Sequence, residues 1–298
     1  MSDAPSLEAA AKPSIWRWLR AATGILFLGS LGIMAWRNGA ILRHIEIPVL
    51  LANASASMLT VIGNSLLLRW ITSVTTKPLA LSEATLLSAL GSLGNALGGL
   101  PIGTAAVVAI LMRDHGIAVR DIIAGKLLAT ALAVITAALL TSLLAYHSPA
   151  PWRLICLLIT AAGMASLFLL PQRMPQRLPG RDLLLRLCHP PVLMEGLMLA
   201  AFTTLTMMLA YGIIIHRYLP ALDIADGIFI SGTSLLLGFA SMSSVIGGVQ
   251  EVITGFTTHY SQLSFAAGVE ISLFMRIGGW IAAATLFACS WCWRYSRR

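Results

Sequence analysis

Six long apolar runs, separated by short polar stretches, dominate the pattern of the chain. They cover residues 21–36, 47–69, 122–146, 152–170, 192–216 and 265–293. A helix of about 20 apolar residues crosses the hydrocarbon core of a bilayer, and the run at 21–36 crosses it with some local thinning. The pattern therefore predicts an all-α polytopic membrane protein with about six transmembrane helices.

Two further apolar segments, at 81–112 and 228–262, are broken near their middle. A Gly-Gly-Leu-Pro run ending at Pro101 interrupts the first, and a serine-rich stretch with Gly247 and Gly248 interrupts the second. Hydrocarbon tolerates non-helical backbone only where protein or a water-filled cavity surrounds it. Each segment is therefore predicted to form a broken, re-entrant helical hairpin beside a polar cavity at membrane depth.

The distribution of positive charge predicts how these elements are oriented. Cytoplasmic loops of membrane proteins are rich in Lys and Arg. Most of the 20 Lys and Arg residues become cytoplasmic if the N-terminus is inside and each hairpin enters and leaves on one side. If the first hairpin instead crossed the membrane once, the loops carrying Arg113 and Arg177 would both be exported. The charge pattern favours the hairpin, with both termini in the cytoplasm.

This topology makes the chain an inverted repeat. The first half contains two spans, a hairpin entered from inside and a third span; the second half has the same order but starts on the opposite face. We expect residues 1–15 to be a disordered cytoplasmic N-terminus, 16–147 the first membrane repeat and 148–298 the second. Inverted repeats with discontinuous helices at matching positions are typical of carriers with a site near the membrane midplane.

Composition supports a membrane protein and limits other functions. The chain is 57% hydrophobic and 11% charged, so no stretch is polar enough for a separate soluble domain. Its net charge of +8 does not indicate nucleic-acid binding, because the basic residues lie between apolar spans. The four cysteines form no disulfide framework, and no motif for a metal or cofactor is present.

Glu251 and Arg276 are the ionisable residues most deeply placed in apolar sequence. Arg276 lies roughly 16 Å into its predicted helix, and an ionised side chain at the bilayer centre costs about 2.5–3.5 kcal/mol, so neither residue should face lipid. One interpretation is that Arg276 binds an anionic head group and Glu251 is its counter-charge in the empty state. The other is a structural ion pair that locks the second hairpin to the last helix.

Other candidate substrate-binding residues flank the two breaks or face them from the second span. They are Lys126, Asn95, Pro101, Gln250, Gly247, Gly248 and Asn64. Lys126 occupies in the first half the place of Arg276 in the second, although a long side chain could also reach back toward Arg120 at the membrane surface. Asn64 ends a polar stripe on one helix face with Asn53, Ser57 and Thr60. Such a stripe lines a cavity or a helix contact, and we favour the contact.

Two blocks of the sequence resemble a known family. The first contains Asn95, Pro101-x-Gly103, Arg113-x-x-Gly116 and Lys126; the second contains Gly247-Gly248-Val249-Gln250-Glu251, Ala266 and Arg276. Both are similar to the membrane domain of lysylphosphatidylglycerol synthases and their stand-alone flippase-like relatives, over residues 21–293. The sequence departs from the family at three places. Gln250 precedes Glu251 where the family usually has a further Gly and an Arg, and Gly125-Lys126 replaces an acidic residue followed by Arg. The Arg that the family usually has soon after Pro-x-x-Gly is missing.

The resemblance implies translocation of an amphipathic lipid between leaflets, without the aminoacylation that a soluble domain of the synthases performs. We therefore expect a translocase of the bacterial inner membrane for a lipid or lipid-linked glycan, whose head group is anionic. Its partners would be the lipid and either a second copy of the chain or a separate biosynthetic enzyme, with no cofactor. The alternatives are a membrane-embedded transferase acting on a lipid carrier, which needs an acidic cluster on one face, and an ion-coupled solute carrier, which needs a tight pocket.

Cysteine labelling in a cysteine-free background tests the predicted topology. In intact cells, three single cysteines at cytoplasmic positions should be protected from a membrane-impermeant thiol reagent: Arg113, Arg177 and Arg298. Three at external positions should be labelled: Arg43, His147 and Asp223. Labelling at Arg177 would contradict both the hairpin assignment and the inverted repeat.

Overall fold

The described part of the chain is entirely helical. The computed structural model describes residues 29, 33, 45–75, 78–96, 102–145, 149–173, 180–240, 249–260 and 264–295. Beyond an isolated helical position at Gly29 and another at Ile33, these residues form ten helices. They are α2 (Ile47–Ser73), α3 (Leu81–Ala96), α4 (Ile102–His115), α5 (Val119–Leu144), α6 (Ala150–Arg173), α7 (Arg181–Leu187), α8 (Pro190–Tyr218), α9 (Ile224–Ala240), α10 (Val249–Tyr260) and α11 (Phe265–Tyr295).

Five of the helices, α2, α5, α6, α8 and α11, are long and apolar enough to cross a membrane. They correspond to five of the six predicted spans, and the sixth, at 21–36, lies outside the described residues apart from Gly29 and Ile33. An α-helix satisfies its backbone hydrogen bonds internally, which hydrocarbon requires. Most residues of α6 remain accessible, as expected for a helix that faces lipid. The chain is therefore a helical membrane protein.

Each broken segment forms two shorter helices that pack against each other, α3 with α4 and α9 with α10. The arms of the first pair are antiparallel, because contacts join both of their ends. Asn95 Oδ1 accepts a hydrogen bond from the Thr104 backbone N–H at 3.1 Å, and Glu83 Oε1 lies 3.3 Å from His115 Nε2. Gly103 approaches the backbone of Gly91 so closely that a side chain at 103 would clash. The connecting residues 97–101 and 241–248 lie outside the described part.

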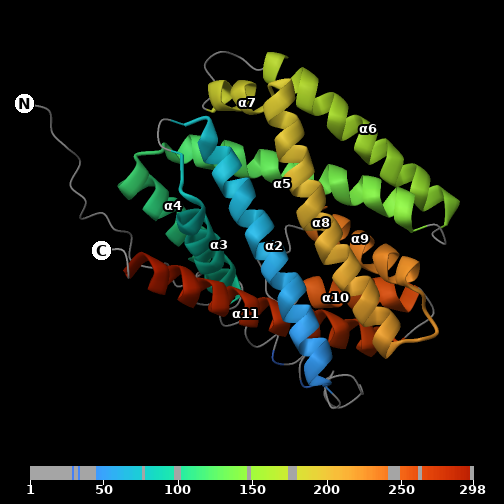
Figure 1. The fold of residues 1–298 in the computed structure, drawn as a ribbon. Helices are drawn as coiled ribbons and strands as arrows, with labels where there is room; N and C mark the ends of the chain where they lie inside the picture. The colour runs from blue at the N-terminus through green and yellow to red at the C-terminus, as the bar shows by residue number, and fades with distance from the viewer. Residues whose placement is uncertain are drawn as a thin grey trace, which may run out of the picture.

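The helices are arranged around the central pair α2 and α8, which run side by side with the two broken segments at opposite ends of the bundle (Figure 1). Trp70 of α2 packs its ring on Gly196 of α8 and donates its indole N–H to the Val192 carbonyl at 2.7 Å. Helix α3 packs on α11, and α9 packs on α5. Each hairpin therefore contacts the last helix of the other half of the chain.

Two local features were not predicted. Helix α7 has only 7 residues, which is too short for a periodic pattern to show in the sequence, and its Leu183 and Leu187 pack into the core formed by α2, α5 and α8. Gly116 ends α4 with φ 66° and turns the chain into α5, and its N–H bonds the Met112 carbonyl at 3.0 Å. A left-handed residue at this place favours glycine.

Gly227 of α9 tests the close contact between α8 and α9. A Cβ at this position would lie 2.5 Å from the Cα of Gly212, so the two backbones would have to separate. We expect Gly227→Ala to lower the free energy of unfolding by about 1–3 kcal/mol, measured by thermal unfolding in detergent with tryptophan fluorescence. Gly279→Ala is the matched control, because no heavy atom lies within 4 Å of its Cβ position. Equal thermal stability of the two variants would contradict the close contact between α8 and α9.

Candidate functional site

A buried ion pair joins the second hairpin to the last helix. Arg276 of α11 donates from Nε to Glu251 Oε1 at 2.6 Å, and a second guanidinium nitrogen lies 2.5 Å from the same oxygen. The Glu251 side chain is 1% exposed, whereas that of Arg276 is 22% exposed. The carboxylate is therefore enclosed by protein, while the guanidinium keeps a face open to the neighbouring cavity.

The position of Arg276 is fixed by contacts of α11 with both of its neighbours. Asn53 of α2 is buried and donates its side-chain amide to the Phe274 carbonyl at 2.8 Å. On the other side, Gly268 packs against Gly255 of α10, where a Cβ would lie 2.8 Å from the Gly255 Cα. Small residues allow helix backbones to approach closely in membranes. Arg276 is thus held between α2 and α10.

One oxygen of the ion pair is left without a partner. Glu251 Oε2 is buried and makes no hydrogen bond to any described residue. An unsatisfied buried acceptor is costly, and polar atoms in native structures usually find protein or water partners. Since Glu251 also lines a cavity, water or a donor group of a bound molecule would satisfy this oxygen.

The cavity beside the ion pair has a volume of about 350 Å³. It lies between α2, α3, α8, α10 and α11. Its polar lining consists of Ser57, Thr60, Asn64, Ser92, Asn95, Tyr211, Gln250, Glu251, Ser272 and Arg276. Glu251 and Arg276 are the charged members of the lining, and their formal charges cancel. The remaining hydroxyl and amide groups can donate or accept hydrogen bonds with a polar head group.

A second cavity of about 320 Å³ adjoins the first, since both are lined by Asn64, Ser92 and Asn95. It is bounded by α2, α3, α4, α5 and α8, and Lys126 is its charged lining residue. Lys126 Nζ donates to Thr104 Oγ1 at 3.2 Å, and Asn95 Nδ2 donates to the same hydroxyl at 3.1 Å. The two cavities place a cation near each end of a polar path within the bundle.

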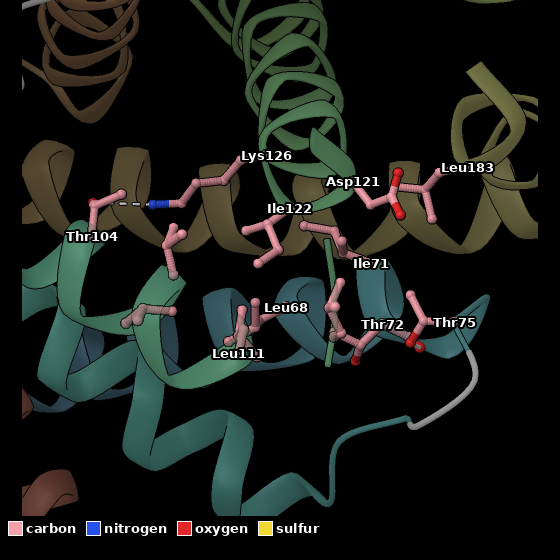
Figure 2. A pocket seen from close by; sticks show the side chains of 13 residues that line it. Leu68, Ile71, Thr72, Thr75, Thr104, Leu111, Asp121, Ile122, Lys126 and Leu183 are labelled. Atoms are coloured by element: carbon pink, nitrogen blue, oxygen red, sulfur yellow. Dashed lines mark hydrogen bonds between the residues drawn. The ribbon is translucent and has the colours of Figure 1, made fainter. Parts of the chain in front are cut away.

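Figure 2 shows the lower part of the space between α4 and α5. Lys126 extends toward Thr104, while Leu68, Leu111 and Ile122 close the region below it. This pocket has a volume of about 20 Å³, which is room for a single water molecule and no larger ligand. The cavity of about 320 Å³, which shares Thr104 and Lys126 with this pocket, is therefore the part of the candidate site next to Lys126.

The structure brings most of the predicted site residues together. Arg276, Glu251, Gln250, Asn64 and Asn95 line the first cavity, and Lys126 lines the second. Lys126 reaches across to α4, not back toward Arg120. Pro101, Gly247 and Gly248 lie outside the described residues.

The prediction that the polar stripe of the second span is a helix contact was mostly wrong. Ser57, Thr60 and Asn64 line the first cavity, and Asn53 makes the contact. Glu270 of α11 is buried at 1% exposure although it lies near the start of a predicted span.

Several lining residues were missed by the sequence analysis, among them Ser88, Ser92, Thr104, Tyr211 and Ser272. Ser88, Ser92 and Asn95 recur at spacings of four and three, which places them on one helix face and could have revealed the α3 lining. Within the described part of the chain, no group of three or more His, Cys, Asp or Glu side chains could hold a metal ion.

Substitution of the ion pair tests its contribution to stability. Arg276→Met leaves the enclosed Glu251 carboxylate without its counter-charge, so we expect a loss of about 3–5 kcal/mol. The double variant Glu251→Leu/Arg276→Met should recover most of that loss, measured as the unfolding midpoint in detergent. Arg217→Ala serves as control, because the Arg217–Glu46 pair at 2.8 Å is exposed and its loss should change stability little. A double variant as unstable as the single one would show that the pair itself is required for folding.

Comparison with models of protein families, with characterised proteins and with solved structures finds no match for this chain. The family expected from the two sequence blocks therefore stays a prediction. A function for the chain has to be argued from the helices, the cavities and the ion pair described above.

Proposed function

We propose that this protein moves an amphipathic lipid with an anionic head group between the leaflets of a bilayer. The observation that carries the proposal is the pair of adjoining cavities inside a bundle of membrane-length helices. Both are lined by polar and apolar side chains, with Lys126 in one lining and Arg276 in the other. Ionisable residues within membrane segments mark substrate pathways when they face a cavity and not lipid. Both cations meet that condition.

The lining of the cavities suits a polar head group carrying one negative charge. Neutral hydroxyl and amide groups surround the cations, and the charged members Lys126, Glu251 and Arg276 sum to one positive charge. One anionic group on the substrate would neutralise the path, while the acyl chains remain in the surrounding hydrocarbon. A site of this composition favours lipids over small apolar solutes.

The packing of the helices supports the inverted repeat expected from the charge distribution. If α2, α3, α4 and α5 correspond to α8, α9, α10 and α11, several of the observed contacts occur in matching pairs, although α10 packs much more closely on α11 than α4 does on α5. Helix α2 packs on α3 as α8 packs on α9, α3 packs on α11 as α9 packs on α5, and α5 packs on α8 as α11 packs on α2. A repeat of this kind is the architecture of many carriers with a midplane site.

Family and location belong to the same proposal. The sequence blocks around Pro101 and Glu251 favour a stand-alone relative of the lysylphosphatidylglycerol synthase membrane domain. The distribution of Lys and Arg favours both termini in the cytoplasm. The family resemblance favours a bacterial inner membrane. The lipid would come from, or pass to, an enzyme that attaches or alters head groups.

Leaflet transfer of a fluorescent short-chain phosphatidylglycerol in proteoliposomes tests the function. Wild-type protein should move the lipid to the bleachable outer leaflet faster than protein-free vesicles do. Arg276→Met and Lys126→Met should reduce the rate to that background, because each removes a cation from the path. Arg217→Ala, which removes an exposed charge outside both cavities, should keep the wild-type rate.

The double variant Glu251→Leu/Arg276→Met separates the two interpretations of the ion pair. It removes the unpaired charge that destabilises the single variant, so it should fold, and yet it should remain inactive. A folded, transport-competent double variant would show that the pair is structural only. Failure of the wild-type protein to transfer any lipid tested would contradict the proposed function.

A further inference from the structure

The two halves of the chain contain equivalent contacts between a cation and a hairpin. Thr104 is the third residue of α4, and Glu251 is the third residue of α10. Each accepts a hydrogen bond from the cation of the following helix, Thr104 from Lys126 at 3.2 Å and Glu251 from Arg276 at 2.6 Å. The repeat therefore places a cation against the start of the second arm of each hairpin.

The packing around these equivalent contacts is not equal. Helix α10 lies directly along α11, with Gly255 against Gly268 and Val252 packed on the buried Val269. Helix α4 packs less closely on α5, although Leu111 and Ile122 share one buried cluster, and the cavity of about 320 Å³ lies beside them with Val107 and Ala129 in its lining. The second hairpin is thus closed on its helix, and the first is open.

The charged residues at the two contacts differ in the same way as the packing. On the closed side Arg276 is neutralised by Glu251, whose side chain is fully enclosed. On the open side Lys126 is accessible, and no acidic residue lines the cavity of about 320 Å³ among the described residues. The open side therefore presents a cation ready for an anionic group, whereas the cation on the closed side is occupied by the protein itself.

We propose that the two hairpins are alternating gates of one lipid path, an inference that rests on the proposed function. In the state described, the α4–α5 gate is open and an anionic head group binds at Lys126, while the α10–α11 gate is shut by the Arg276–Glu251 pair. In the opposite state α4 packs along α5, α10 leaves α11, and the head group replaces Glu251 as the partner of Arg276. By the charge distribution, the open gate faces the cytoplasm.

An energetic argument supports the exchange. Opening the second gate separates a buried ion pair, which is unfavourable unless another anion reaches Arg276 and water reaches Glu251. A head group arriving from Lys126 supplies that anion. The empty protein therefore keeps the second gate shut, which prevents both gates from opening at once.

Disulfide cross-linking across each gate tests the proposal in full-length protein from which other cysteines have been removed. The pair Val252→Cys/Val269→Cys spans the closed gate and should oxidise readily, with transfer lost on oxidation and restored by reduction. The pair Val107→Cys/Ala129→Cys faces across the open gate and should oxidise slowly at rest. Adding Glu251→Gln removes the ion pair that holds the second gate, so oxidation of the 107–129 pair should accelerate by about tenfold or more.

A cross-link within the fixed part of the bundle is the matched control. Ala138 of α5 and the native Cys156 of α6 belong to one buried cluster that contains no residue of α4, α10 or α11, so oxidation of the Ala138→Cys variant there should leave transfer unchanged. The gate proposal would be overturned if lipid transfer continued with the 252–269 disulfide formed. It would also be overturned if Glu251→Gln left the oxidation rate of the 107–129 cysteine pair unchanged. In both cases the transport function would stand. If the cross-linking rates respond as expected but the protein transfers no tested lipid, the alternating gates would be supported and the proposed function contradicted.

Discussion

The cost of placing charge in hydrocarbon is the constraint on which the rest of this structure depends. Glu251 and Arg276 are ionisable groups in an apolar bundle, and each is acceptable only because the other lies within 2.6 Å. Keeping them together requires α10 to lie close along α11, which the Gly255–Gly268 contact allows. It also requires α11 to keep its rotational position, which the Asn53 amide fixes through the Phe274 carbonyl. One electrostatic requirement thus determines the packing of three helices.

The same constraint explains why polar residues gather at the two hairpins. At membrane depth, a polar group that is not satisfied within its own helix is tolerated only where other polar groups or water surround it. Asn95 and Lys126 both donate hydrogen bonds to the Thr104 hydroxyl, so these polar side chains satisfy one another. The two cavities meet at Asn64, Ser92 and Asn95. The polar path is therefore a single feature built from several helices, not two separate pockets.

The long helices could be predicted because a run of about 20 consecutive apolar residues indicates a helix that crosses the membrane. Side-chain roles were harder to predict, because a hydroxyl in a helix can bond a backbone carbonyl of the preceding turn in any surroundings. Thr60 does so with Ala56 at 3.2 Å even though it lines a cavity, whereas Asn53 bonds α11, across the helix contact. Sequence spacing places both on one face but does not say which helix meets that face.

The short arms of the first hairpin have a consequence for how the protein is made. Helix α3 has 16 residues and α4 has 14. At 1.5 Å per residue these helices are about 24 Å and 21 Å long, less than the roughly 30 Å hydrocarbon core. Moreover, α3 packs on α11, which is synthesised later than the hairpin itself. We therefore expect the first hairpin to reach its final packing only after α11 has been synthesised.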